Sequence, residues 1–139
     1  MAKAEESHSV KKSTEATTRC DEGGDEILAF RVPARSDDVV TFSIWVCKAN
    51  ARVRLWLTLL PNGVDRLIID ETGKDDASAQ LNPSLPAGEY LLRWSILTPS
   101  EKWQTKTELA VGGTTRFRWR KHADSDNPVK GGTLLLVVA

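Results

Sequence analysis

Apolar and polar side chains alternate strictly through the middle of the chain. Residues 39–47 place aliphatic and aromatic side chains at every second position, and residues 52–60 repeat the pattern. Period-two alternation predicts half-buried strands. A short turn at residues 48–51 predicts that the two strands form a hairpin, in which Trp45 faces Arg54 and stacks with it on the side away from the core.

Similar patterns predict further strands at residues 27–32, 64–70, 90–96, 105–111, 115–121 and 133–138. In the first of these we expect Leu28, Phe30 and Val32 to point inward. The segments 71–79 and 122–132 are polar and are expected to be loops. No segment has a helical period, so we predict an all-β fold of about eight strands. Two packed antiparallel sheets, in a jelly-roll or immunoglobulin-like β-sandwich, satisfy this pattern.

The first 26 residues differ in composition from the rest of the chain. They are rich in Lys, Glu, Ser, Thr and Ala and have almost no large apolar side chain. Such a segment buries too little surface to offset the entropy of ordering it. We therefore predict a flexible N-terminal arm over residues 1–26 and one β-sandwich domain over residues 27–139.

Charge and hydropathy exclude several classes of partner. Nineteen basic residues balance nineteen acidic ones, so no net field favours nucleic acid. No apolar run reaches the roughly 20 residues of a membrane span. The N-terminal residues lack the apolar segment of a secretory signal, so we expect a cytoplasmic protein as written, with export by a signal-independent route as the alternative.

Two cysteines allow one disulfide but no disulfide framework. Cys47 ends a predicted strand and is most simply a small buried apolar residue. Cys20 lies in the polar segment and is expected to be an exposed thiol.

Tryptophan is the main functional clue, with five tryptophans against one tyrosine. Trp45 and Trp56 have the opposite parity from the aliphatic rows of their strands, and Arg52 and Arg54 share that parity. Trp and Arg dominate protein interfaces, and an indole also stacks on sugars. This face is therefore either a protein interface or a sugar-binding surface. The third interpretation is that another segment covers this face and makes both tryptophans part of the core.

A second candidate is a basic stripe. Arg116, Arg118 and Arg120 occupy alternate positions of one predicted strand. Such a row suits phosphates or acidic sugars. A charged row also protects an edge strand from pairing with another chain.

Metal binding and catalysis have weak support. Asp124, Asp126 and Asn127 offer calcium-binding oxygens but lack the spacing of a calcium loop, so we expect no metal or other cofactor, with calcium as the weak candidate. The two histidines, His8 and His122, lie in the predicted arm and in a loop, and no catalytic motif is present. A small hydrolase using His122 is the least supported reading.

These observations predict a non-enzymatic binding or assembly module. We expect a homo-oligomer or a protein partner, bound by the aromatic and arginine face. A lectin-like module with a glycan ligand is the alternative.

Overall fold

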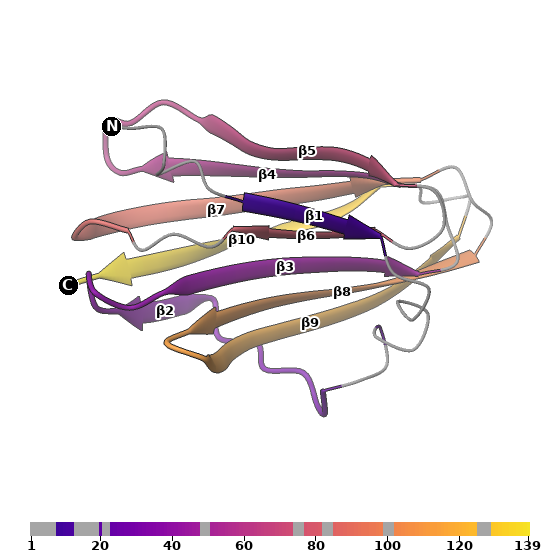
Figure 1. Ribbon diagram of the computed structural model, residues 1–139, viewed down its shortest axis with the longest axis horizontal. Helices are drawn as coiled ribbons and strands as arrows, with labels where there is room; N and C mark the ends of the chain where they lie inside the picture. Colours follow the sequence, from indigo (N-terminus) through magenta and orange to yellow (C-terminus); the bar gives the residue numbers. More distant parts are fainter. Residues whose placement is uncertain are drawn as a thin grey trace.

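A computed structural model describes residues 8–12, 20, 23–47, 51–73, 77–81, 85–98, 102–124 and 129–139. Every regular element in these ranges is a strand, and the strands form two packed five-stranded sheets (Figure 1). Sheet A has the order β1 (His8–Lys12), β6 (Ala77–Leu81), β3 (Val40–Cys47), β8 (Lys102–Val111) and β9 (Thr114–Asp124). Sheet B has the order β2 (Arg31–Ala34), β10 (Val129–Val138), β7 (Gly88–Leu97), β4 (Ala51–Leu59) and β5 (Arg66–Gly73).

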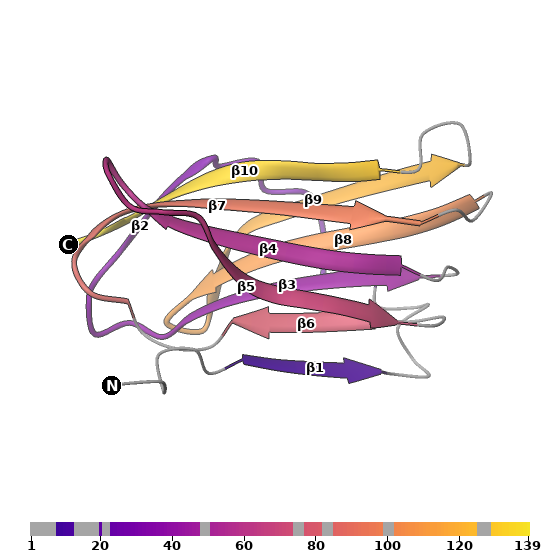
Figure 2. The ribbon, with the colours of Figure 1, turned by 90° about the horizontal axis from the view of Figure 1, so that it is seen from above.

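The predicted all-β sandwich is confirmed. All strand pairs are antiparallel except β2 with β10, which run parallel. Figure 2 shows the two sheets stacked, with β9 lying beneath the β10 side and β1 beneath the β5 side. The described part contains no helix long and apolar enough to cross a membrane.

The core lies between the sheets, where the alternating side chains of both inner faces meet. Trp94 of β7 is its largest member and contacts three other aromatic rings, with centroid separations of 5.4 Å to Phe42, 5.7 Å to Phe117 and 5.8 Å to Trp119. Gly132 of β10 makes room for this indole, because a Cβ there would lie 2.9 Å from a Trp94 ring carbon. The apolar rows that alternation predicts in β3, β4, β7 and β9 therefore form the observed core, except at Leu59, the last residue of β4, which is 46% exposed.

The predicted hairpin of the central strands is wrong. β3 pairs with β6 and β8 in sheet A, whereas β4 pairs with β5 and β7 in sheet B. The chain crosses from one sheet to the other between these strands. Alternation alone cannot distinguish the two arrangements, because both bury the same face of each strand.

The structure has ten strands where about eight were expected. One addition is β6, which lies in a segment predicted partly as a polar loop. The other is β1, in the predicted arm, which pairs antiparallel with β6 over five residues.

The segment after the predicted arm also differs from expectation. Leu28 and Phe30 are each 53% exposed, and the strand begins only at Arg31. Ile27 forms a bridge to Arg118 of β9, and the Phe30 carbonyl accepts a hydrogen bond from Leu135 N of β10 at 2.9 Å. Residues 27–30 therefore connect the edge of sheet A to the edge of sheet B. They are not part of a strand, so their side chains do not alternate between the core and the solvent.

Candidate binding face

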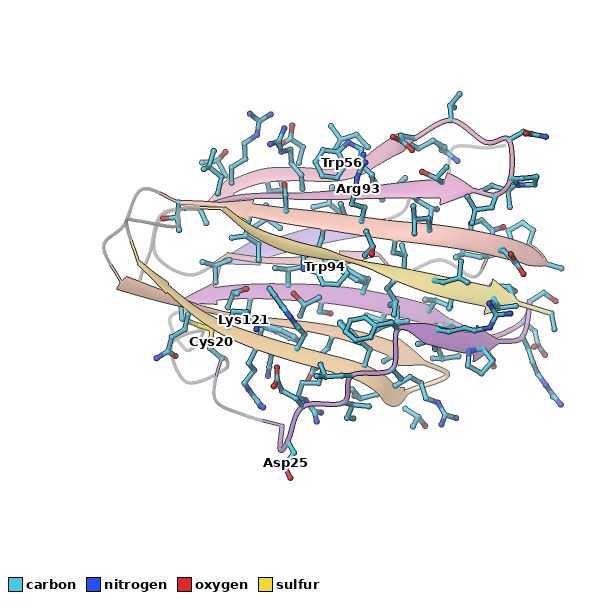
Figure 3. All side chains as sticks on the ribbon, turned by 180° about the vertical axis from the view of Figure 1, so that it is seen from behind. Cys20, Asp25, Trp56, Arg93, Trp94 and Lys121 are labelled. Carbon is cyan, nitrogen blue, oxygen red and sulfur yellow. A yellow bond between two sulfur atoms is a disulfide. The ribbon has the colours of Figure 1, made fainter. Side chains whose placement is uncertain are left out.

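Trp56 lies on the outer face of sheet B because it alternates with the buried Leu55 and Leu57 of β4. In the sheet register it pairs with Arg93 of β7 on one side and with Leu67 of β5 on the other. Figure 3 shows Trp56 and Arg93 beside each other beyond this sheet, with Trp94 between the sheets.

Two guanidinium groups lie over the Trp56 indole. The Cζ atom of Arg93 is 4.8 Å from the ring centroid, and that of Arg54 is 5.2 Å away. These are cation–π distances. We call the outward residues Arg52, Arg54, Trp56 and Arg93, together with the carboxylates of Asp65 and Asp70, the Trp56 cluster.

Two ion pairs flank the indole. Arg52 donates two hydrogen bonds to Asp70, of 2.8 and 2.7 Å. These bonds and the charge of Asp70 raise the pKa of Arg52, and the bonds from Arg52 lower the pKa of Asp70 below its ordinary value. On the other side, Asp65 accepts hydrogen bonds from Arg93 Nη2 at 3.2 Å and from Thr58 Oγ1 at 2.5 Å.

Arg54 is different from the other arginines of the cluster. Its Nε is buried and has no hydrogen-bond partner, and the same holds for Oγ of Ser95, its cross-strand neighbour on β7. Arg54 lies opposite Asp70 in the register of β4 with β5, and its charge contributes to the lowered pKa of Asp70. The Asp70 carboxylate is therefore hydrogen-bonded to Arg52 and interacts electrostatically with Arg54.

The outer face of sheet A also carries a tryptophan beside a cation, but both side chains are covered by other parts of the protein. Lys106 Nζ lies 4.4 Å from the centroid of the Trp45 ring and 3.9 Å from a carboxylate oxygen of Glu108. The Lys106 side chain is 4% exposed. Trp45 is partly buried against a disulfide between Cys20 and Cys47, both of which are buried. The expectation of an exposed Cys20 thiol is therefore wrong.

The predicted basic stripe is mostly used inside the chain. Arg118 Nε donates to Glu108 at 2.6 Å, and Arg118 Nη1 donates to the carbonyl of Asp25 at 3.0 Å. Arg120 Nε donates to the carbonyl of Cys20 at 2.9 Å, and a second donor of Arg120 bonds the Gly24 carbonyl. These two arginines hold Cys20, Gly24 and Asp25 against sheet A, within the segment that was predicted to be a flexible arm.

Arg116, the third member of the stripe, is exposed and lies where the pairing of β8 with β9 shifts register, between Thr115 and Phe117. It lines an open hollow of about 570 Å³ at one end of the sandwich, together with Arg35, Asp38 and the C-terminal Ala139. The stripe is therefore not one continuous basic surface.

The structure also divides the predicted aromatic patch. Arg52, Arg54 and Trp56 lie together on sheet B, whereas Trp45 lies on the opposite outer face. Sequence reasoning missed Arg93 and Asp65 as members of the Trp56 cluster. Arg93 has the outward parity on its strand, but only the pairing of β7 with β4 places it beside Trp56.

The candidate calcium ligands and His122 are only partly covered by the structure. Asp126 and Asn127 lie outside the described residues, and for Asp124, the last residue of β9, only the backbone is described. His122 pairs with Gln104 in the backbone register, and its side chain is likewise outside the described part. Within the described residues no group of three His, Cys, Asp or Glu side chains is placed to hold a metal.

Comparison with known proteins gives little more. No protein-family model matches the chain, and no curated protein matches it. Similar solved structures include two DUF4425 domains of unknown function, from Bacteroides vulgatus and Bacteroides ovatus. Each is 11% identical, covering 70% of this chain and 93% or 94% of its own, with TM-scores of 0.37 and 0.38. A likeness this weak carries no argument about function.

Proposed function

We propose that the protein is a non-enzymatic binding module that docks a protein partner on the outer face of sheet B. The observation that carries this proposal is an indole held under two guanidinium groups on a solvent-facing sheet surface. Tryptophan and arginine are the residues that contribute most to protein interfaces. Leu67, 49% exposed beside Trp56 in the register, adds apolar surface to the same face.

A carbohydrate platform is the alternative. Sugar binding of this kind uses an open indole face that stacks on a pyranose ring. In the Trp56 cluster, Arg54 and Arg93 already lie over the indole, so a sugar has to displace at least one of them. This arrangement favours a protein partner, whose carboxylates and apolar side chains fit the arginines and the ring edge together.

An enzyme has less support. A hydrolase based on His122 requires a nucleophile or a carboxylate beside it, and the Cys47 sulfur is bonded to Cys20. We therefore assign no catalytic residue.

The disulfide supports a location that differs from the cytoplasmic expectation. Structural disulfides persist in oxidising compartments and are rare in the cytosol. Because the Cys20–Cys47 bond is buried and fixes residue 20 on sheet A, we propose that the protein works in such a compartment. Alkylation of the natively produced protein after denaturation should label neither cysteine unless a reductant is added first.

Site-specific photo-crosslinking tests the proposed function. A photoreactive residue replaces Leu67 on the binding face, and in a control it replaces Val39, which is similarly exposed (50%) but lies outside sheet B. In cells that make the protein, we expect protein adducts from position 67 that disappear when Trp56→Ala is added, and none from position 39. Equal adducts from both positions, or binding of Trp56-dependent glycans without protein adducts, would contradict the proposal.

A further inference from the structure

The hollow at one end of the sandwich lies where edge strands of the two sheets come together, and it is separate from the Trp56 cluster. Arg35 follows β2 of sheet B, and Arg116 lies on β9 of sheet A. Figure 1 shows β2, the carboxyl end of the chain and the turn between β8 and β9 at the same end of the molecule. The volume of the hollow, about 570 Å³, is within the range of small-molecule sites, roughly 300 to 1,000 Å³.

Arg116 belongs to this hollow because β9 is irregular at that residue. Leu109 of β8 pairs with Phe117, and the next residue of β8, Ala110, pairs with Thr115, so Arg116 is an extra residue in β9. Strict alternation would place Arg116 on the outer face of sheet A with the rest of the basic stripe. A β-bulge redirects the side chain of the extra residue, and Arg116 lines the hollow instead.

Backbone hydrogen bonds fix the chain around the hollow. Arg35 N donates to Asp38 Oδ2 at 2.9 Å, and Asp38 N donates to the Arg35 carbonyl at 3.0 Å, which closes the turn after β2. Gly112 N donates to the Val39 carbonyl at 2.9 Å and so joins this turn to the one between β8 and β9. The backbone of the site is therefore in place before a ligand arrives, which lowers the entropic cost of binding.

The two guanidinium groups of the hollow have no partner within the described part of the chain. Arg35 and Arg116 form no side-chain hydrogen bond and no ion pair there. In this they differ from Arg118 and Arg120 of the same stripe, whose side chains bond to a carboxylate and to backbone carbonyls. A free guanidinium group binds a carboxylate or a phosphate through two parallel hydrogen bonds.

The rest of the lining suits an organic molecule better than a bare ion. The carboxyl groups of Asp38 and Ala139 also reach the hollow, and each accepts a hydrogen bond from a backbone N–H of the turn after β2. Because these charges balance those of the two arginines, a ligand is attracted by hydrogen bonds at short range and not by a net field. Ala34 and Val111, each 7% exposed, add an apolar floor on which the body of a ligand can rest.

We propose that this hollow binds a small organic anion, whose carboxylate or phosphate group is held between the guanidinium groups of Arg35 and Arg116. An acidic sugar or a sugar phosphate has the required charge and size. Thr114, exposed in the same lining, supplies a hydroxyl for a further hydrogen bond. This site lies outside the face proposed for the protein partner, so it is a second binding function and does not depend on the first.

NMR titration of the full, disulfide-bonded chain tests the site. Glucuronate, glucose 6-phosphate, inorganic phosphate and glucose are added separately at constant ionic strength. We expect glucuronate or glucose 6-phosphate to shift the backbone amide signals of residues 34–36 and 112–116, with a dissociation constant of about 1 mM or less. The tighter of the two identifies the anionic group. Inorganic phosphate should bind at least about tenfold more weakly than the tighter ligand, and glucose should not bind.

Substitution of the arginines completes the test. Arg35→Gln and Arg116→Gln each remove one charged donor, so we expect each to raise the dissociation constant at least about tenfold. Arg31→Gln is the matched control, since Arg31 is also exposed and lies on β2 but outside the hollow, and it should bind as the wild type does. Thermal melting verifies that every variant is folded. Failure of both organic anions to bind, equal binding of glucose or inorganic phosphate, or unchanged binding in both Arg35→Gln and Arg116→Gln would overturn the proposal.

Discussion

The two outer faces of the sandwich use the same combination of residues to opposite effect. Each has a tryptophan beside a cation and an arginine–carboxylate pair of nearly equal length, 2.6 Å for Arg118–Glu108 and 2.7 Å for Arg52–Asp70. On sheet A the paired side chains are 11% and 17% exposed, and on sheet B they are 47% and 30% exposed. The described residues cover the first face and leave the second open.

The difference arises from Cys20 and residues 23–27. The Cys20–Cys47 disulfide, the bonds of Arg118 and Arg120 to backbone carbonyls, and the Ile27 bridge fix these residues on sheet A. In Figure 3, Cys20 and Asp25 lie beyond one sheet and Trp56 and Arg93 beyond the other. An outward-facing tryptophan is thus accessible to a partner only where no other segment covers it.

Removing the disulfide should have the largest effect on this contrast. Cys20→Ala together with Cys47→Ala releases a crosslink between residues 27 positions apart, which in the chain-entropy account costs about 3.5 kcal/mol of unfolding free energy. Urea unfolding of the variant and of the wild type measures the loss. The same stability in both proteins would mean that the attachment of Cys20 and residues 23–27 to sheet A does not depend on the crosslink.

A matched pair of carboxylate changes should come next. Glu108→Gln removes the carboxylate that two largely buried cations, Arg118 and Lys106, share, and we expect a loss of about 2 to 3 kcal/mol of unfolding free energy. Asp70→Asn removes the partner of the exposed Arg52, and we expect a much smaller loss, since solvent screens that pair. Chemical denaturation of both variants tests the difference, and equal losses would show that the two faces are equally exposed.

Removing Trp45 should destabilise the protein more than removing Trp56. Trp45→Ala removes an indole that packs on the disulfide and on Lys106, so we expect a loss of about 2 kcal/mol. Trp56→Ala should cost less than about 1 kcal/mol, because its neighbours Arg93 and Leu67 are exposed, while weakening partner binding. A larger stability loss for Trp56 than for Trp45 would reverse our assignment.

The smallest expected effect is the loss of stability of the Arg52–Asp70 pair at acidic pH. Because Arg52 lowers the pKa of Asp70, the pair contributes stability above the ordinary Asp value near pH 3.9, and this contribution is lost as the pH falls through the lowered value. Carboxyl NMR should show Asp70 titrating below its ordinary range, and Arg52→Ala should return it to that range. An unchanged Asp70 titration in Arg52→Ala would disprove the cause.

Much of the fold could be predicted from the sequence, because alternation fixes which side of a strand is buried. The inward rows around Phe42, Leu55, Trp94 and Phe117 follow from parity alone. Parity carries no information on which strands pair, so the sequence could not show that Trp45 and Trp56 lie on opposite faces or that Arg93 joins Trp56.

The contacts of the N-terminal segment could not be predicted for a different reason. Composition shows only that residues 1–26 have little apolar surface to bury. What attaches Cys20 and residues 23–27 to sheet A is one covalent bond and polar contacts to Arg118 and Arg120, and neither leaves a periodic signal in the sequence.

The central claim is that the outer face of sheet B makes the contact with the partner and that of sheet A does not. We would test it by fluorine NMR of protein labelled with 5-fluorotryptophan, with a soluble paramagnetic agent, before and after addition of an extract of the cells that make the protein. Trp45→Phe and Trp56→Phe assign the two signals. Our account predicts that the Trp56 signal shifts and becomes protected when the extract is present, while the Trp45 signal is unchanged. Protection of Trp45 instead, or no change at Trp56 in the extract, would contradict it.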